Sequence, residues 1–180
     1  MKYRLFVLLG LILVTEIAIA GGANADNCKK NEIEISLLEY LFCENKNNIE
    51  ILNIIDGKYT TLVMQAKNQE YSFAKLPVSF SLLDIPNKLN ISLSEFFNRL
   101  ANRDYKANKF PEIRKAFEID ENTVIVKYKK KRFKAVAIIN PKVITNSIYI
   151  YNDDKSVYLL KGKFNKLFSD EFLANLKPKK

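Results

Sequence analysis

The sequence NTVIVKYKKKRFKAVAIINP at residues 122–141 decides how the second half of the chain is interpreted. Two runs rich in Val and Ile flank a basic centre, which predicts two antiparallel strands joined by a turn at residues 130–131. In this register Lys127 lies opposite Lys134, and like charges placed opposite one another destabilise a strand pair. The turn also contains neither Gly nor Asn to ease it. We therefore expect this hairpin to serve a purpose beyond local stability.

The basic tip of this hairpin is the main candidate binding site. It consists of Lys127, Lys129, Lys130, Lys131, Arg132 and Lys134. These charges would dock an acidic partner, with Tyr128 and Phe133, which face each other across the hairpin, as aromatic anchors. The simpler alternative is a solvated tip whose lysines prevent edge-to-edge aggregation.

The composition predicts one folded domain with a basic surface. A chain of 180 residues with 48% hydrophobic positions can bury one ordinary core, so residues 26–180 are expected to form a single domain. The chain has 29 Lys and Arg against 20 Asp and Glu, which gives a formal net charge of +9. Such a charge favours anionic partners, namely acidic proteins, anionic lipids or nucleic acid.

The first residues have the pattern of a cleaved secretory signal. A basic start precedes an apolar run at residues 5–14, and small residues occupy positions 21–25. Glu16 leaves the apolar run shorter than the roughly 20 residues of a membrane-spanning helix. We predict removal of residues 1–25, with a cut after Ala20 as the alternative. The mature chain is then periplasmic or secreted, has no transmembrane segment, and is not expected to meet nucleic acid.

The two cysteines, Cys28 and Cys43, are expected to form a disulfide. Thiols that meet an oxidising compartment with a single available partner usually pair. The bond would tie the mature N-terminus to the first element and contribute roughly 3 kcal/mol to stability. A redox role would need a more closely spaced pair.

The first half of the mature chain is predicted to contain one helix and a strand meander. Apolar residues at helical spacing favour a helix over residues 33–43, although they also alternate as in a strand. Turns at residues 56–57 and 67–68 predict three antiparallel strands over residues 49–75, followed by a short strand at 78–83. These turns place one apolar row at Ile51, Leu62 and Phe73 and the next at Ile49, Met64 and Tyr71.

The second half is predicted to open with a helix. Ser92 and Glu95 form a capping box, followed by apolar residues at helical spacing. Pro111 fits the first position of a short helical turn that carries Ile113 and Phe117. The basic hairpin follows this turn.

A last hairpin and a closing helix complete the predicted elements. Pairing Tyr151 with Ser156 over residues 148–160 places aliphatic residues on a core face and three tyrosines on the other. Those tyrosines, Tyr149, Tyr151 and Tyr158, are a second candidate binding surface, because Tyr is enriched at interface hot spots. Packing under a helix is the alternative role for them. Ser169 is expected to cap a helix over residues 170–176, followed by a frayed end.

Together these elements predict an α+β fold. We expect an antiparallel sheet of roughly seven strands with helices packed on one face and the other face partly open. The order of a helix followed by strands recurs in the two halves. A duplication of one helix-plus-strands unit would explain this order, although no residue-level repeat supports it.

Catalysis is not expected. The chain has no His, which removes histidine base catalysis and the commonest metal ligand. The cysteines are expected to be paired, and the chain has no Gly-rich phosphate loop. The acid pairs at residues 120–121 and 153–154 fall in predicted turns, and the second lacks the ligand spacing of a calcium loop. We therefore predict neither an enzyme nor a bound metal or cofactor.

No sequence motif identifies a family, so the function is inferred from the predicted surface. The main hypothesis is a small exported protein that recognises another protein, such as a periplasmic inhibitor or immunity protein directed at a hydrolytic enzyme or toxin. The alternative is an envelope-associated module that binds anionic lipid or a cell-wall polymer through the same basic surface. An enzyme with two distant carboxylates converging in a pocket is the least favoured hypothesis.

Overall fold

The computed structural model describes residues 28–56, 59–67, 69–76, 84–102, 105, 107, 109–152 and 156–179. The strands are β1 (Glu32–Leu37), β2 (Tyr40–Asn45), β3 (Ile49–Ile55), β4 (Thr61–Ala66), β5 (Gln69–Leu76), β6 (Val124–Lys129), β7 (Lys134–Ile139), β8 (Asn146–Tyr151), β9 (Val157–Lys163) and β10 (Lys177–Pro178). The helices are α1 (Asp84–Lys88), α2 (Leu93–Ala101), α3 (Phe110–Ala116) and α4 (Lys166–Asn175), with a 3-10 helix, η1, at Lys46–Asn48. The predicted leader and the predicted strand at 78–83 lie outside the described residues.

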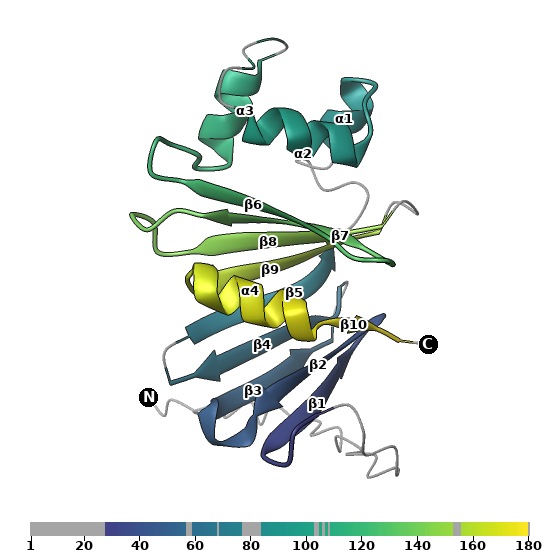
Figure 1. Ribbon diagram of the computed structural model, residues 1–180, viewed down its shortest axis with the longest axis vertical. Coiled ribbons are helices and arrows are strands. Elements are labelled where there is room, and N and C mark those ends of the chain that lie inside the picture. Colours follow the sequence, from purple (N-terminus) through teal and green to yellow (C-terminus); the bar gives the residue numbers. More distant parts are fainter. Residues whose placement is uncertain are drawn as a thin grey trace, which may run out of the picture.

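The strands form two antiparallel sheets, which confirms the predicted α+β class. The large sheet has seven strands in the order β3-β4-β5-β9-β8-β7-β6. Two meanders, β3 to β5 and β6 to β9, therefore join through the pairing of β5 with β9. The small sheet consists of β1, β2 and β10. Figure 1 shows α1 to α3 gathered at one end of the molecule near β6, with α4 crossing the strands.

One face of the large sheet is covered by α4 and the small sheet. On this face the cross-strand partners form one row that crosses every strand of the sheet. The row consists of Ile54, Leu62, Phe73, Leu160, Ile148, Ala137 and Val126. Phe168, Phe172 and Leu173 of α4 belong to the same core, as do Tyr40 and Phe42 of β2. Apart from Ile54, which is 47% exposed, and the partly buried Val126, these side chains are buried, and their burial is the main stabilising contribution of this face.

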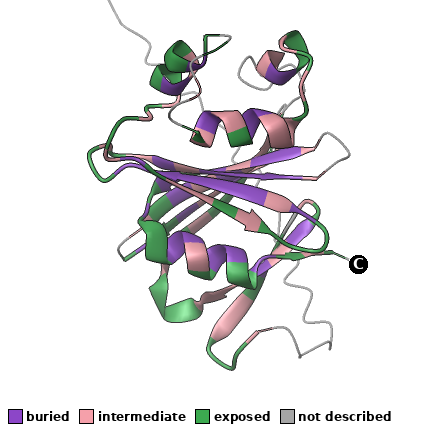
Figure 2. Cartoon of the chain, turned by 45° about the horizontal axis from the view of Figure 1, so that its top comes forward, coloured by how far each residue is buried: buried purple, intermediate pink, exposed green. Residues whose placement is uncertain are grey.

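The other face is covered over only part of its area. The helical residues buried there are Phe96, Phe97, Leu100 and Phe110, which share a core with residues of β7, β8 and β9. The Phe97 ring lies 5.4 Å from that of Tyr149 and 5.2 Å from that of Tyr151. Figure 2 shows α4 and α2 turning their buried sides toward the strands. Helices thus lie on both faces rather than on one, while Ile51 and Ile55 of β3 stay exposed on the open part.

The helices α2 and α3 begin as their sequences predict. The Ser92 side chain accepts a hydrogen bond from the backbone N–H of Glu95 at 3.1 Å. Pro111 lies in the first turn of α3. Backbone N–H groups in a first turn have no acceptor within the helix, so the missing N–H of Pro breaks no helical hydrogen bond. Ile113 and Phe117 pack against the same core as α2.

A buried arginine joins these two helices. Arg114 of α3 is 8% exposed, and its guanidinium reaches the carbonyl oxygens that α2 leaves unpaired at its end. It donates to Leu100 O at 3.1 Å and to Arg99 O at 2.9 Å, and also to the carbonyl oxygens of Asn102 and Tyr105. Because one planar group serves several acceptors, α2 and α3 are held as one unit.

The predicted helix over residues 33–43 is wrong, because this stretch forms the β1–β2 hairpin. Ile35, Tyr40 and Phe42 are buried and all belong to the core under the small sheet. Pairing the two strands places these apolar residues on one face, so packing against the large sheet favours the strand pattern over the helical one. The first half therefore begins with strands, and the predicted likeness of the two halves does not extend to their order of elements.

Both ends of the described chain are attached to β2. The predicted disulfide between Cys28 and Cys43 is present and ties the N-terminal end to this strand. The predicted frayed C-terminus is wrong, because β10 pairs with β2 and places Lys177 opposite Leu41. Backbone groups of these last residues form hydrogen bonds with the open edge of β2. In a frayed end the same groups would bond to water.

The meander β3 to β5 follows the prediction in one register and departs from it in the other. Leu62 lies opposite Phe73 and Met64 opposite Tyr71, as predicted. Leu52, rather than Ile49, lies opposite Met64. An irregularity at the start of β3 changes the pairing there. An odd shift of register exchanges the two faces of a strand, so Ile54 instead of Ile51 lies opposite Leu62.

The closing helix starts earlier than predicted. Asn165 caps α4 by accepting a hydrogen bond from the backbone N–H of Phe168 at 3.0 Å. Ser169, the predicted cap, is instead buried within the helix and donates its hydroxyl to Lys166 O at 2.8 Å. The earlier start lets Phe168 pack against the core, which accounts for the longer helix.

Candidate protein-binding surface

The hairpin that carries the basic tip forms the β6 edge of the large sheet. Its pairing ends with Lys129 opposite Lys134, and residues 130–133 form the loop. The predicted centre of the turn at residues 130–131 is wrong by one residue, because Lys130 donates its backbone N–H to the carbonyl oxygen of Phe133 at 2.9 Å and the turn is centred on residues 131–132. Lys127 consequently lies opposite Val136. Two lysines still face each other, but the pair is Lys129 and Lys134, one residue pair closer to the tip than the predicted pair.

Most of the basic tip is exposed. Lys127, Lys129, Lys130, Lys131 and Arg132 are exposed, and Lys134 is partly buried. The tip residues line two neighbouring depressions of about 350 and 300 Å³, the first completed by Asn152 and the second by Ser94 and Asn98 of α2. The Lys127 ammonium donates to Asn98 Oδ1 at 3.2 Å. The end of α2 thus extends the polar surface around the tip.

The consecutive cations at residues 129–132 lack acidic partners within the described part of the chain, where no carboxylate lies within ion-pair distance of them. Several basic residues elsewhere do have such partners. These ion pairs include Lys75–Glu39, Lys88–Asp84, Arg99–Glu95 and Lys166–Asp170. Positive potential is therefore concentrated at the tip, where it attracts anionic groups.

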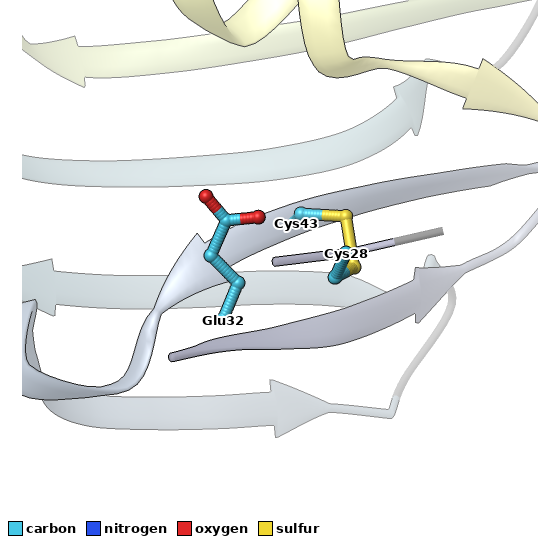
Figure 3. A group of neighbouring side chains, drawn as sticks. All are labelled: Cys28, Glu32 and Cys43. Atoms are coloured by element: carbon cyan, nitrogen blue, oxygen red, sulfur yellow. A yellow bond between two sulfur atoms is a disulfide. The ribbon is translucent and has the colours of Figure 1, made fainter. Parts of the chain in front are cut away.

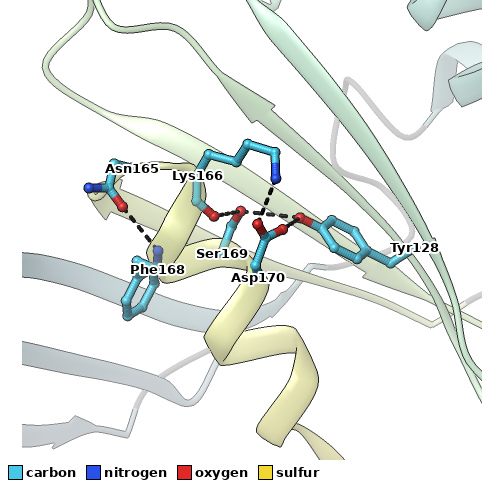
Figure 4. A network of polar contacts seen from close by, with 6 residues as sticks. All are labelled: Tyr128, Asn165, Lys166, Phe168, Ser169 and Asp170. Carbon is cyan, nitrogen blue, oxygen red and sulfur yellow. Dashed lines mark hydrogen bonds and ion pairs between the residues drawn. The ribbon is translucent and has the colours of Figure 1, made fainter.

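The two predicted aromatic anchors turn inward. Phe133 is 4% exposed, and its ring meets that of Tyr40 edge-on at 5.8 Å. The Phe133 ring is therefore part of the core beneath the hairpin. Tyr128 is partly buried and donates its hydroxyl to Asp170, with Ser169 Oγ at 3.3 Å (Figure 4). The Phe133 ring is removed from the surface and the Tyr128 ring is only partly exposed, so the charges make up most of the surface of the tip.

The contact between Tyr128 and Asp170 fixes the hairpin to α4. The Lys166 ammonium, 2.6 Å from the Asp170 carboxylate, and the Tyr128 hydroxyl together lower the pKa of Asp170 (Figure 4). Burial, with Asp170 beside it, raises the pKa of the Tyr128 hydroxyl. Tyr128 therefore stays a neutral hydrogen-bond donor, and the underside of the hairpin is held in place.

The predicted tyrosine face does not form. Tyr151 lies opposite Val157 rather than Ser156, and this shift by one residue sends Tyr158 to the opposite face from Tyr149. All three tyrosines are buried, Tyr149 and Tyr151 under α2 and Tyr158 under the small sheet. Burial raises the pKa of Tyr149 to about 12. These residues lie inside the two cores, as the packing alternative expects.

A third depression, which the sequence analysis missed, lies between the small sheet and α4. Its volume is about 330 Å³, and its acidic lining residues are Glu32, Glu44 and Glu171. Burial raises the pKa of Glu44, and the nearby charges of Glu32 and Glu171 raise it further. The hydrogen bonds that Glu44 accepts lower its pKa but do not cancel this rise. Pairing of β1 with β2 brings Glu32 and Glu44 together, and Glu171 joins them from α4. The alternating residues of 33–37 were the signal for this pairing available in the sequence.

The disulfide borders this acidic depression. A carboxylate oxygen of Glu32 and the sulfurs of Cys28 and Cys43 lie within 4.8 Å of one another (Figure 3). Both sulfurs are bonded to each other, so neither offers the thiolate that a metal ion would bind. The group is a structural link between β2 and the residues before β1.

The acids singled out in the sequence have a turn role where the structure describes them. The Asp120 carboxylate accepts hydrogen bonds from the backbone N–H of Asn122 at 2.8 Å and from Thr123 Oγ1 at 3.0 Å. These bonds hold the turn that leads into β6. The pair at residues 153–154 lies outside the described residues.

Comparison with known proteins adds no relative. The sequence matches no protein-family profile, and no curated protein is significantly similar to it. Among the helices that the structure describes, none is long and apolar enough to cross a membrane. The surface of the molecule is therefore the basis for its proposed function.

Proposed function

We propose that this chain is a protein-binding module whose basic tip docks an acidic surface of another protein. Inhibitors and immunity proteins that block a hydrolytic enzyme or a toxin act by such docking. The observation that carries the proposal is the run of exposed cations at residues 129–132 with no carboxylate in ion-pair distance among the described residues. An acidic partner supplies the opposite charges, which adds specificity and speeds association.

The framework beneath the tip favours this role. Phe133 is packed against Tyr40, and Tyr128 is bonded to Asp170, so the backbone of the hairpin is anchored at two points. A partner therefore has to order the lysine side chains but not the backbone, which reduces the entropic cost of binding. The charges are presented on a rigid support.

The proposed location is periplasmic or secreted. The N-terminal pattern of a cleaved signal supports export, and so does the disulfide between Cys28 and Cys43, because such bonds persist mainly in oxidising compartments. In that location the acidic partner is a protein of the cell envelope or its surroundings. We propose binding without catalysis.

Capture from native envelope and culture fractions tests the proposal. The oxidised protein is compared with the triple variant Lys129→Glu, Lys131→Glu, Arg132→Glu. The matched control reverses three exposed lysines elsewhere, Lys115, Lys142 and Lys161, so that each variant lowers the formal net charge by the same six units. Exposed substitutions usually change stability by no more than about 0.5 kcal/mol, so all three proteins should fold.

We expect the wild type and the matched control to capture one protein in stoichiometric amounts, and the tip variant to capture none. Capture by all three proteins would show that the tip is not the docking surface. Vesicles with and without anionic lipid, together with isolated cell-wall polymer, form a further arm. Binding to these alone, lost at moderate salt, would replace the protein partner with the envelope surface.

A further inference from the structure

Strand β3 forms the second edge of the large sheet, and it is exposed and apolar. The described residues place no strand on its outer side. Ile51, Ile54 and Ile55 are 45%, 47% and 56% exposed, and Tyr59 just beyond the strand is 39% exposed. An edge of this kind offers unpaired backbone groups together with apolar side chains, which favours pairing with another strand.

The opposite edge has the protection that β3 lacks. Strand β6 carries Lys127 and Lys129, and lysines on an edge strand oppose pairing with a second chain. The sequence of β3, IEILNII, contains no Lys or Arg although the chain has 29 of them. Its single charged residue is Glu50, near one end. A short, apolar and almost uncharged strand is the best match for this edge.

The sequence of β3 itself fits this description. The apolar residues of β3 are arranged symmetrically about Asn53. Leu52 and Ile54 flank it, and Ile51 and Ile55 are the next residues on either side. In an antiparallel pair related by a two-fold axis, one residue lies opposite its own copy and its neighbours pair in this mirrored order. We propose that two copies of the protein pair through β3, with Asn53 opposite Asn53 and apolar residues matched on both sides. The two large sheets then continue as one.

The position of the basic tip is compatible with this dimer. The tip belongs to the edge opposite β3, six strand spacings away, or about 29 Å at the usual separation of strands. In the dimer the two tips lie at the outer edges of the joined sheet. Their separation is much larger than the Debye length of about 8 Å at physiological ionic strength, so their repulsion is screened. The dimer does not depend on the proposed function.

Sedimentation velocity over a concentration series tests the dimer. The protein is expressed from the full sequence and measured with its disulfide formed. Ile54→Lys and Val124→Lys form a matched pair, because the two residues lie on opposite edge strands and are each 47% exposed. We expect wild type and Val124→Lys to dimerise alike. Ile54→Lys should raise the dissociation constant at least about 30-fold, because two lysines enter the apolar interface.

A wild-type protein that stays monomeric throughout the series overturns the proposal. Equal weakening by Val124→Lys also overturns it, because that residue lies outside the interface. Circular dichroism of each variant shows whether the fold is retained.

A cysteine variant tests the symmetry axis independently of the lysine variants. Facing residues in an antiparallel pair have Cα atoms about 4.5 to 5.5 Å apart, within the range that a disulfide spans. Asn53→Cys should therefore give a covalent dimer on mild oxidation, whereas Val124→Cys should not. Peptide mapping verifies that Cys28 and Cys43 remain bonded to each other. A dimer that does not cross-link through residue 53 contradicts the proposed register.

Discussion

The two faces of the large sheet are covered by parts of the chain with very different separations in sequence. One face is covered by α4 and the small sheet, which come from both ends of the described chain. The other is covered by α2 and α3, which belong to the continuous stretch between β5 and β6. The first face therefore depends on segments from both ends of the described chain, whereas the second depends on one continuous segment. Substitutions on each face can test this difference.

The largest expected effect is that of Gly162→Ala, in β9 beneath the first face. Gly162 lies opposite Tyr71 of β5, and an added Cβ would stand 2.1 Å from Glu70 O and 2.5 Å from Tyr71 Cα. Because backbone atoms cannot move aside without breaking the pairing of β5 with β9, we expect a loss of more than about 4 kcal/mol. Urea unfolding followed by circular dichroism measures it. Lys163→Ala, one residue further on and exposed, should change stability by less than about 0.5 kcal/mol.

Phe96→Ala and Phe172→Ala compare the two faces directly. Each removes a buried ring, one from α2 and one from α4, and each should cost about 3 to 5 kcal/mol. We expect a single unfolding transition in both variants, because both cores pack on the same strands. Tyrosine fluorescence and circular dichroism can follow it, since the chain has no Trp. Two separated transitions in Phe96→Ala would show that α2 and α3 unfold independently of the rest of the fold.

Removal of the disulfide should weaken the first face alone. The bond joins residues 15 positions apart, for which the chain-entropy model gives about 3 kcal/mol. The double variant Cys28→Ser, Cys43→Ser is compared with the oxidised wild type by urea unfolding. An unchanged midpoint would mean that pairing of β1 with β2 suffices to hold the N-terminal end.

Arg114→Lys should weaken the second face by about 2 kcal/mol. The ammonium keeps the charge but cannot serve the separate carbonyl oxygens that the planar guanidinium reaches. Thermal unfolding measures the loss, with Lys115→Arg on the exposed side of α3 as control. Equal stability of Arg114→Lys and the wild type would show that the clamp between α2 and α3 is dispensable.

The smallest effect is expected for Glu44→Gln in the acidic depression. Burial raises the pKa of Glu44, so the folded state favours its protonated form. The stability from this group is complete below the pKa of the unfolded chain and is lost as the pH rises through the raised value. Glu44→Gln should therefore raise the melting temperature at pH 7 and change it little below about pH 4. The same shift at both pH values would exclude ionisation as the cause.

Local signals were sufficient where a short stretch determines the geometry. The capping residue Ser92, the register of β4 with β5 and the disulfide were all predicted from the sequence. Residues 33–43 failed because helix and strand patterns coincide there, and contact with the distant large sheet decides between them. The same holds for the closing residues of the chain, whose partner β2 lies far away in sequence.

The basic residues of the candidate site could be predicted from the sequence, but the orientation of its aromatic side chains could not. The cations at 129–132 are visible in any sequence, and the structure leaves them exposed. The inward turn of Phe133 depends on Tyr40, which no local pattern near the hairpin reveals. The face of Tyr158 depends on the number of residues in one loop, and an error of one residue exchanges the faces of a strand.

The position of β10 determines when the protein can finish folding. Strand β2 receives its last neighbour from residues 177–178, so the small sheet is incomplete until these residues have been made. Closing so long a loop is among the slow steps of folding, because its entropy is lost before its contacts form. Until residues 177–178 pair with β2, that strand keeps one edge open to pairing with another chain.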